Sequence, residues 1–184
     1  KEVLFRGKVD TRIDRGREIV KGIDQDIIAT AKRAGVGDAQ LQDDVNKYLW
    51  ARHAPERNAK LGNGAAGITT EEANEMVKAI EASPYGKEVI RIANKVSEFN
   101  KETLDILLEG GVITKELHTL LRSTYKNHIP LQRIFEETES ISEVLSGRGF
   151  DVRGTGLKRA KGSEREVADI MASVTTNYEQ AILR

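Results

Sequence analysis

The stretch that decides the fold is PYGKEVIRIANKVSEFNKETLDILLE, residues 84–109. Its mainly apolar positions recur at alternating steps of four and three, the heptad-like spacing that places one continuous seam along a helix. The seam residues are Tyr85, Val89, Ile92, Val96, Phe99, Thr103 and Ile106. Ser83 is a suitable N-cap before Pro84, and Gly110-Gly111 is a stop signal. The pattern predicts one long helix over 84–109.

Helical patterns of the same kind lie on both sides of this segment. Toward the N-terminus we expect helices over 10–34, from an N-cap at Asp38, and over 70–82, the last opened by a capping box of Thr69 and Glu72. Pro55 removes a backbone donor, so we expect the second of these helices to kink or break near Arg52–Ala54.

Toward the C-terminus we expect helices after Thr114, over 131–146, and from a capping box of Ser163 and Glu166 to the end. The residues expected to face the core are Leu117, Leu120, Leu121 and Tyr125 in the first of these helices, and Val167, Ile170, Met171, Val174, Tyr178 and Ile182 in the last. A glycine-rich loop over 147–162 separates the last two. No strand pattern of useful length occurs. The predicted fold is all-α, with about seven helices in an irregular bundle. It divides into an N-terminal helical segment, 1–62, and a bundle segment, 69–184, which we expect to form one compact unit excerpted from a larger chain.

Composition excludes several classes of function. The 184 residues include 29 basic and 29 acidic side chains and no cysteine. Zero net charge argues against a uniformly basic nucleic-acid binder. The lack of cysteine removes disulfides, thiolate zinc sites and a cysteine nucleophile. No apolar run approaches the roughly 18 residues of a membrane span.

The charge is nevertheless unevenly distributed. Residues 102–145 hold eight acids and four bases, whereas the glycine-rich residues 148–165 hold six bases and two acids. The six bases are Arg148, Arg153, Lys158, Arg159, Lys161 and Arg165. Two interpretations remain open: a flexible arm that follows a phosphate backbone, or a surface loop that docks on the neighbouring acidic segment. The second is favoured, since charged surface runs are common.

No constellation of residues indicates catalysis or metal binding. The three histidines, His53, His118 and His128, lack the spacing of metal ligands, and no nucleophile elbow is present. We therefore expect no metal and no cofactor. Trp50 is interpreted as a core residue.

The charged residues around Pro55 allow three readings. Arg52, Glu56 and Arg57 could bind an anion, form a local ion pair, or supply donors to carbonyls freed at the proline. The last is favoured. His53 and His128, each beside an expected helix break, are given the same role.

Three segments together resemble a known family. They are Tyr48–Ala59 (YLWARHAPERNA), Gly67–Ala73 (GITTEEA), and Tyr125–Leu131 (YKNHIPL, with Pro130) followed by Gly156–Ser163 (GLKRAKGS). Their order over residues 40–184 is similar to the large polyvalent-protein-associated helical domains of bacteriophages and conjugative elements. The ARHAPERNA string is the most specific part.

The resemblance implies a non-enzymatic structural or interaction module of a giant protein that is delivered into the host with DNA. Any catalysis would then belong to other domains of the parent chain. Expected partners are other segments or copies of that protein, other virion proteins and weakly bound DNA, and the expected location is the virion or the host cytoplasm. The alternative function is nucleic-acid binding through the basic arm, 148–165.

Overall fold

The computed structural model describes residues 2–124, 126–129 and 169–183, and this part of the chain contains helices and no strands. The helices are α1 (Glu2–Ala34), α2 (Asp38–Leu61), α3 (Thr70–Glu81), α4 (Gly86–Glu109), α5 (Lys115–Thr124) and α7 (Ile170–Leu183). The all-α class is confirmed, but the described residues form six helices rather than about seven. The helix expected over 131–146, the loop over 147–162 and the capping box at Ser163 lie outside the described residues.

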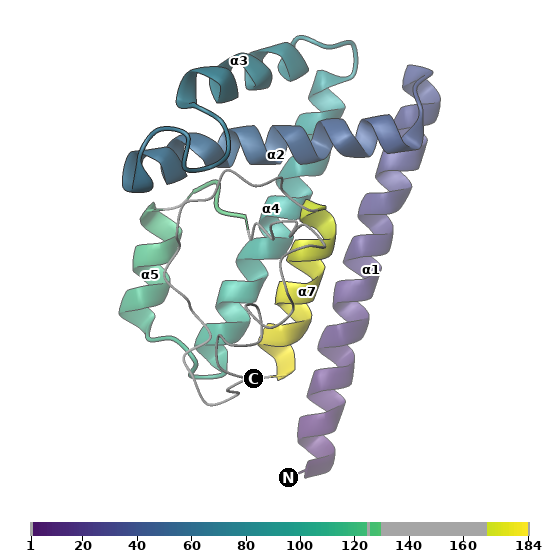
Figure 1. The fold of residues 1–184 in the computed structure, drawn as a ribbon. Coiled ribbons are helices and arrows are strands. Elements are labelled where there is room, and N and C mark those ends of the chain that lie inside the picture. Colours follow the sequence, from purple (N-terminus) through teal and green to yellow (C-terminus); the bar gives the residue numbers. More distant parts are fainter. Residues whose placement is uncertain (1, 125, 130–168, 184) are drawn as a thin grey trace, which may run out of the picture.

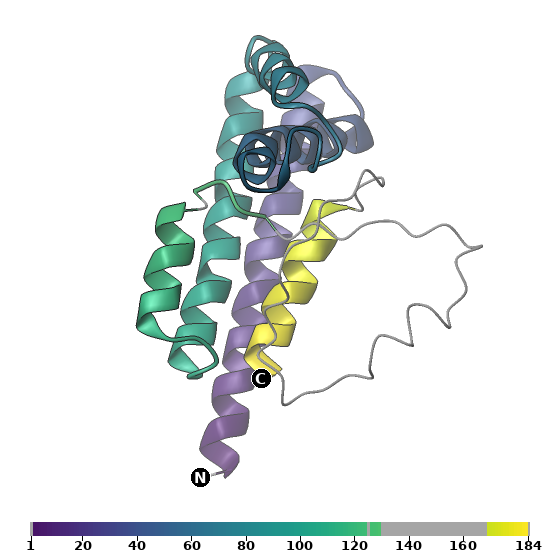
Figure 2. The same cartoon turned by 60° about the vertical axis from the view of Figure 1, so that its left-hand side comes forward.

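Helix α4 is the centre of the bundle and packs against every other described helix, as Figure 1 shows. Helices α1 and α7 run alongside it, while α2 crosses over one end of the bundle with α3 above it. Helix α5 lies on the side of α4 away from α1 (Figure 2). The first turns of α1 extend beyond the neighbouring helices in both views.

The predicted seam of α4 forms the middle of the core. From Val89 to Ile106 its six residues are all buried, and Tyr85 before them is half-buried. One hydrophobic cluster joins this seam to α1, α2 and α7, so the core includes residues on both sides of the predicted division at 62–69. In α7 the residues predicted to face the core are buried: Ile170, Met171, Val174, Tyr178 and Ile182.

Helix α4 begins at Gly86, two residues later than predicted. The Gly86 N–H donates to the carbonyl of Ser83 at 3.0 Å, so Ser83 and Pro84 form a turn between α3 and α4 and do not cap a helix. A Cβ on Gly86 would lie 2.4 Å from the carbonyl oxygen of Glu81. The first residue of α4 is thus set by the close contact with the end of α3. Capping rules consider only neighbouring residues in the sequence and cannot predict such a contact.

Three other helix boundaries and one core face differ from the predictions. Helix α1 begins at Glu2, not at residue 10, because nothing in residues 2–9 interrupts a helix. Asp38 is the first residue of α2 and does not cap it, since Gly37 occupies the N-cap. Helix α7 begins after Asp169, whose carboxylate accepts the Met171 N–H at 2.9 Å. Leu120, predicted to be core, is 58% exposed on α5.

The capping box of Thr69 and Glu72 is confirmed. The Glu72 N–H donates to Thr69 Oγ1 at 3.2 Å, and the Glu72 carboxylate accepts the Thr69 N–H at 2.8 Å. These bonds satisfy donors at the start of α3. The Thr69 N–H and hydroxyl both donate to the Glu72 carboxylate and lower its pKa.

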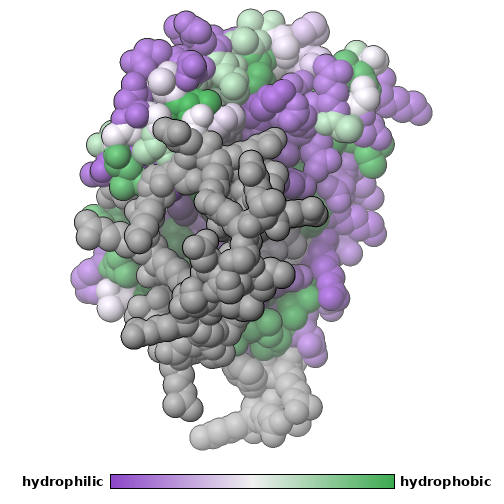
Figure 3. Space-filling model, in the orientation of Figure 1, coloured by the Kyte–Doolittle hydropathy of each residue, from purple (hydrophilic) through white to green (hydrophobic). Residues whose placement is uncertain are grey.

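Hydrophilic residues cover most of the outer surface along α1, and hydrophobic residues appear as smaller separate patches (Figure 3). Among the described residues, no helix combines the length and the apolar character needed to cross a bilayer.

Candidate interaction site

The conspicuous sequence motif around Pro55 lies in the C-terminal half of α2, and the helix passes through it. Of the kink or break predicted near Arg52–Ala54, the break is wrong, because α2 continues to Leu61 with Pro55 inside it. Proline in a helix interior costs about 3 kcal/mol. Side chains on both sides of Pro55 bind other parts of the chain, and these tertiary contacts offset that local cost. We call the set Trp50, Arg52, Glu56, Arg57 and Asn58 the α2 hub.

Asn58 organises the loop that follows α2. Its side chain is buried, and its Nδ2 donates to the carbonyl of Ile68 at 2.9 Å. Its Oδ1 accepts the Ala66 N–H at 2.9 Å, and Nδ2 also lies 3.3 Å from Thr70 Oγ1. One amide side chain therefore satisfies both a donor and an acceptor of the loop backbone.

Two further hub residues bind the same loop. The Trp50 indole N–H donates to the carbonyl of Ala66 at 2.9 Å, and Arg57 Nε donates to the carbonyl of Ala65 at 3.3 Å. Burial lowers the pKa of Arg57. Trp50 is half-buried and packs against the main core, which agrees with its interpretation as a core residue.

Alanines in the motif allow the loop and α3 to come close to α2. Ala51, Ala54, Ala66 and Ala73 form a second small cluster, and each has no exposed surface. A larger side chain at these positions would push the loop away from Asn58. The ARHAPERNA string therefore pairs small side chains for close approach with polar side chains that bind what approaches.

Arg52 and Glu56 hold the segment after α5. The Glu56 carboxylate accepts the Asn127 backbone N–H at 3.1 Å and its Nδ2 at 3.0 Å. Arg52 Nη2 donates to Asn127 Oδ1 at 2.7 Å, and Nη1 donates to Asn94 Oδ1 on α4 at 3.0 Å. Arg52 therefore binds amide oxygens of other elements, and the prediction that it serves carbonyls freed in α2 is wrong.

The two histidines expected beside helix breaks lie against each other. The rings of His53 and His128 are 5.5 Å apart at 70°, and His53 is buried. Asn100 Nδ2 on α4 donates to the carbonyl of His128 at 2.8 Å. The structure thus brings Arg52, His53 and Glu56 together with residues 126–129. Pro130 and the six basic residues from Arg148 to Arg165 lie outside the described residues.

The acidic segment is largely committed to internal pairs where the structure describes it. Arg15 binds Glu102 at 3.0 Å, and Arg12 binds Glu109, so two of its acids hold α1. Asp105 lies 2.7 Å from His118 Nε2 and links α4 to α5. The spacing of charged residues in the sequence does not predict this pair, because His118 and Asp105 are thirteen positions apart.

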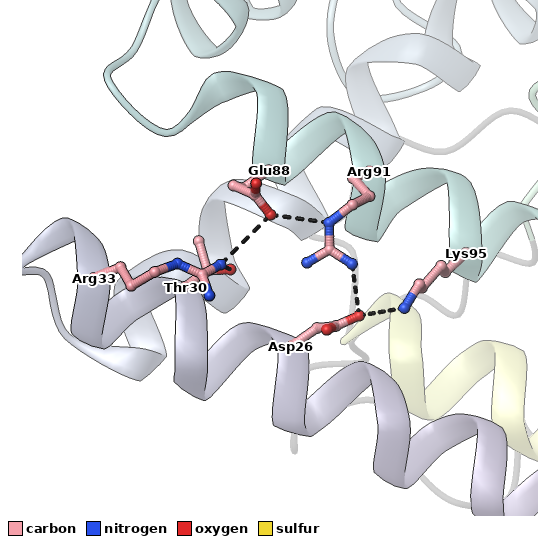
Figure 4. Close-up of polar contacts among 6 residues, drawn as sticks. All are labelled: Asp26, Thr30, Arg33, Glu88, Arg91 and Lys95. Atoms are coloured by element: carbon pink, nitrogen blue, oxygen red, sulfur yellow. Dashed lines mark hydrogen bonds and ion pairs between the residues drawn. The ribbon is translucent and has the colours of Figure 1, made fainter.

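A second strip of charges joins α1 to α4 (Figure 4). Asp26 accepts from Lys95 Nζ at 2.5 Å and from Arg91 Nη1 at 3.0 Å. Glu88 binds Arg91 at 2.9 Å and lies 3.7 Å from Arg33. The hydrogen bond from Lys95, supplemented by Arg91, lowers the pKa of Asp26. Asp26 of α1 faces the cations Arg91 and Lys95 of α4, and Arg33 faces Glu88, so a shift that brought Arg33 against Arg91 would place like charges together.

In the described part of the chain, no group of three or more His, Cys, Asp or Glu side chains is placed to hold a metal ion. Comparisons with known proteins found no matching family model, no matching curated protein and no matching solved structure.

Proposed function

We propose that this chain is a non-enzymatic structural and interaction module of a large polyvalent protein of a bacteriophage or mobile element, delivered into the host with DNA. The observation that carries the proposal is the α2 hub. The most specific part of the resemblance, ARHAPERNA, supplies side chains that bind the chain itself. A polar motif used in this way maintains a shape.

The contacts of the hub support a scaffolding role over a catalytic one. Arg52 and Glu56 are joined through Asn127, and Asn58 is enclosed by loop backbone. A catalytic acid, base or anion-binding arginine needs a bonding group directed at a substrate. Here the carboxylate and guanidinium groups already have protein partners at hydrogen-bond distance.

The proposal is tested on the purified chain by three measurements. Light scattering reports self-association, affinity capture with the proteins of the same phage or element reports partners, and an activity screen reports turnover. We expect association with copies or with virion proteins and no turnover. A chain that stays monomeric, retains no such protein and turns over a substrate would overturn the proposal.

The second candidate function is nucleic-acid binding through residues 148–165, and it is supported by the six bases among their eight charged residues. Binding should weaken with salt at a slope of about −0.9 per phosphate neutralised. Changing Lys158, Arg159 and Lys161 together to Ala should flatten that slope. An unchanged slope would remove this candidate.

A further inference from the structure

Two hollows meet along the surface seam between α1 and α7. The smaller, about 230 Å³, lies between Ile13 and Tyr178, and the larger, about 710 Å³, extends toward Ile28 and the start of α2. Val20, Asp24 and Thr175 line both, so the two hollows are neighbours. At 1.5 Å per residue, the stretch of α1 from Ile13 to Ile28 is about 22 Å long, or roughly four helical turns.

The larger hollow is lined by both apolar and polar residues. Its apolar lining comes from both helices and consists of Val20, Ile27, Ile28, Met171 and Ala172. Ile28 is 53% exposed although it lies well inside α1. A single exposed isoleucine is ordinary on a protein surface, but Ile28 lines the hollow together with Val20 and Ala172, and these side chains offer a place for another apolar side chain.

The rim of the larger hollow is acidic. Asp24, Asp38 and Asp169 line it, and no Lys or Arg among the described residues does. Asp169 is occupied, since it accepts from Gln42 at 3.2 Å and caps α7. Asp24 and Asp38 make no hydrogen bond or ion pair within the part of the chain that the structure describes. The smaller hollow is mixed in charge, with Arg17 and Lys21 beside Asp24.

We propose that the α1–α7 seam binds a cationic amphipathic helix of a partner protein. The apolar face of that helix would lie on Val20 and Ile28, and its Lys or Arg side chains would pair with Asp24 and Asp38. A helix that lies between two helices packs its side-chain ridges into their grooves. Its apolar side chains at i, i+4 and i+7 would contact the apolar residues of the hollow. Charge selects the partner. A neutral or acidic helix would remove water from the carboxylates of Asp24 and Asp38 without supplying a cation in its place.

This inference rests on the proposed interaction role and names the partner's chemistry. The probe is a fluorescein-labelled 18-residue helical peptide of Leu and Lys, with Leu at i, i+3, i+4 and i+7, and the comparison peptide has Glu in place of each Lys. Fluorescence anisotropy with the full chain gives the Kd of each. We expect saturable binding of the Lys peptide, weaker at high salt, and at least about tenfold weaker binding of the Glu peptide.

Matched variants locate the binding. Asp24→Lys should raise the Kd of the Lys peptide about fivefold or more, whereas Glu75→Lys, an exposed and unpaired acid on α3, should leave it unchanged. Ile28→Ala should raise it, whereas Leu120→Ala, at 58% exposure on α5, should not. Hydrogen exchange should slow over residues 13–28 when the Lys peptide binds.

Three outcomes would overturn the inference. The first is equal binding of the two peptides, and the second is an equal effect of Asp24→Lys and Glu75→Lys on the Kd of the Lys peptide. The third is concentration-dependent self-association that Ile28→Ala abolishes, because a second copy of the chain would then occupy the seam. Capture of virion proteins that survives Asp24→Lys and Ile28→Ala would leave the proposed function standing while this inference fails.

Discussion

Replacing Asn58 by Asp tests whether the α2 hub holds the loop over 62–69. The change is almost isosteric, and the bond from the Ala66 N–H to Oδ1 can persist. The amide donor that faces the carbonyl of Ile68 at 2.9 Å becomes an oxygen facing an oxygen. Losing that bond and leaving a buried carbonyl opposite a charge should lower the free energy of unfolding by about 3 kcal/mol at pH 7.

The loss should shrink in acid. Burial beside a carbonyl disfavours the charged form of an aspartate at position 58, so its pKa in the folded variant is raised above the unfolded value of about 3.9. Between those two values the folded state binds more protons, so stability relative to wild type rises as the pH falls through the raised pKa. The protonated acid can again donate to Ile68, and the difference should narrow to about 1 kcal/mol.

Urea unfolding followed by circular dichroism at pH 7 and at about pH 4.5 measures both differences. Trp50, the single tryptophan, donates to Ala66 and therefore reports opening of the loop through its emission. The control is Asn74→Asp, at an exposed position on α3 outside the contacts of Asn58, and it should change stability by less than about 1 kcal/mol. Wild-type stability of Asn58→Asp at pH 7, or a difference that grows in acid, would refute the scaffolding role of Asn58.

Gly86→Ala should destabilise by about 2 kcal/mol, because the new Cβ would lie 2.4 Å from the Glu81 carbonyl oxygen. Gly22→Ala, at a helical glycine with nothing within 4 Å, should stabilise by about 1 kcal/mol, so thermal unfolding should give opposite signs for the two. Asp26→Asn should lower the free energy of unfolding by about 1 kcal/mol at pH 7. Because the pKa of Asp26 is lowered in the folded state, this difference from wild type should narrow as the pH falls below about 4 in urea titrations. Tyr178→Phe should cost about 1 kcal/mol, measured in the same way, by removing a 3.1 Å bond to a carbonyl of α1.

Patterns that are complete within one element could be predicted from the sequence. The α4 seam from Val89 to Ile106 needs only its spacing, and the capping box of Thr69 and Glu72 needs only two residues three apart. Both are local, and both appear in the structure as predicted. The stop at Gly110-Gly111 belongs to the same class, with Gly111 at φ +70°.

Features decided between elements could not be predicted in this way. Pro55 is a strong local breaker, yet Arg52 and Asn58 bind other elements on either side of it and α2 continues. Leu120 has the spacing of a core residue, but no described helix covers that face of α5. Spacing shows which residues share a face, whereas the topology determines which faces are covered.

The candidate site was predicted in part. The sequence indicated Arg52, His53 and Glu56 as a group, and the structure places them together, but their partner Asn127 lies 71 positions after Glu56 and carries no signal of its own. The α1–α7 seam was not predicted, because Asp24 and Ile28 belong to an ordinary amphipathic pattern. Only the positions of α2 and α7 make them the rim and floor of a hollow.

The internal ion pairs also bear on the basic segment over 148–165. Its docking on the acidic segment was the favoured interpretation because the two lie side by side in the sequence. Glu102 and Glu109 already bind Arg15 and Arg12 of α1, and Asp105 binds His118. These carboxylates already have cationic partners within the bundle, so the described part of the acidic segment would gain less from the arm than its sequence suggests. The salt dependence of nucleic-acid binding is therefore the more informative first measurement on that segment.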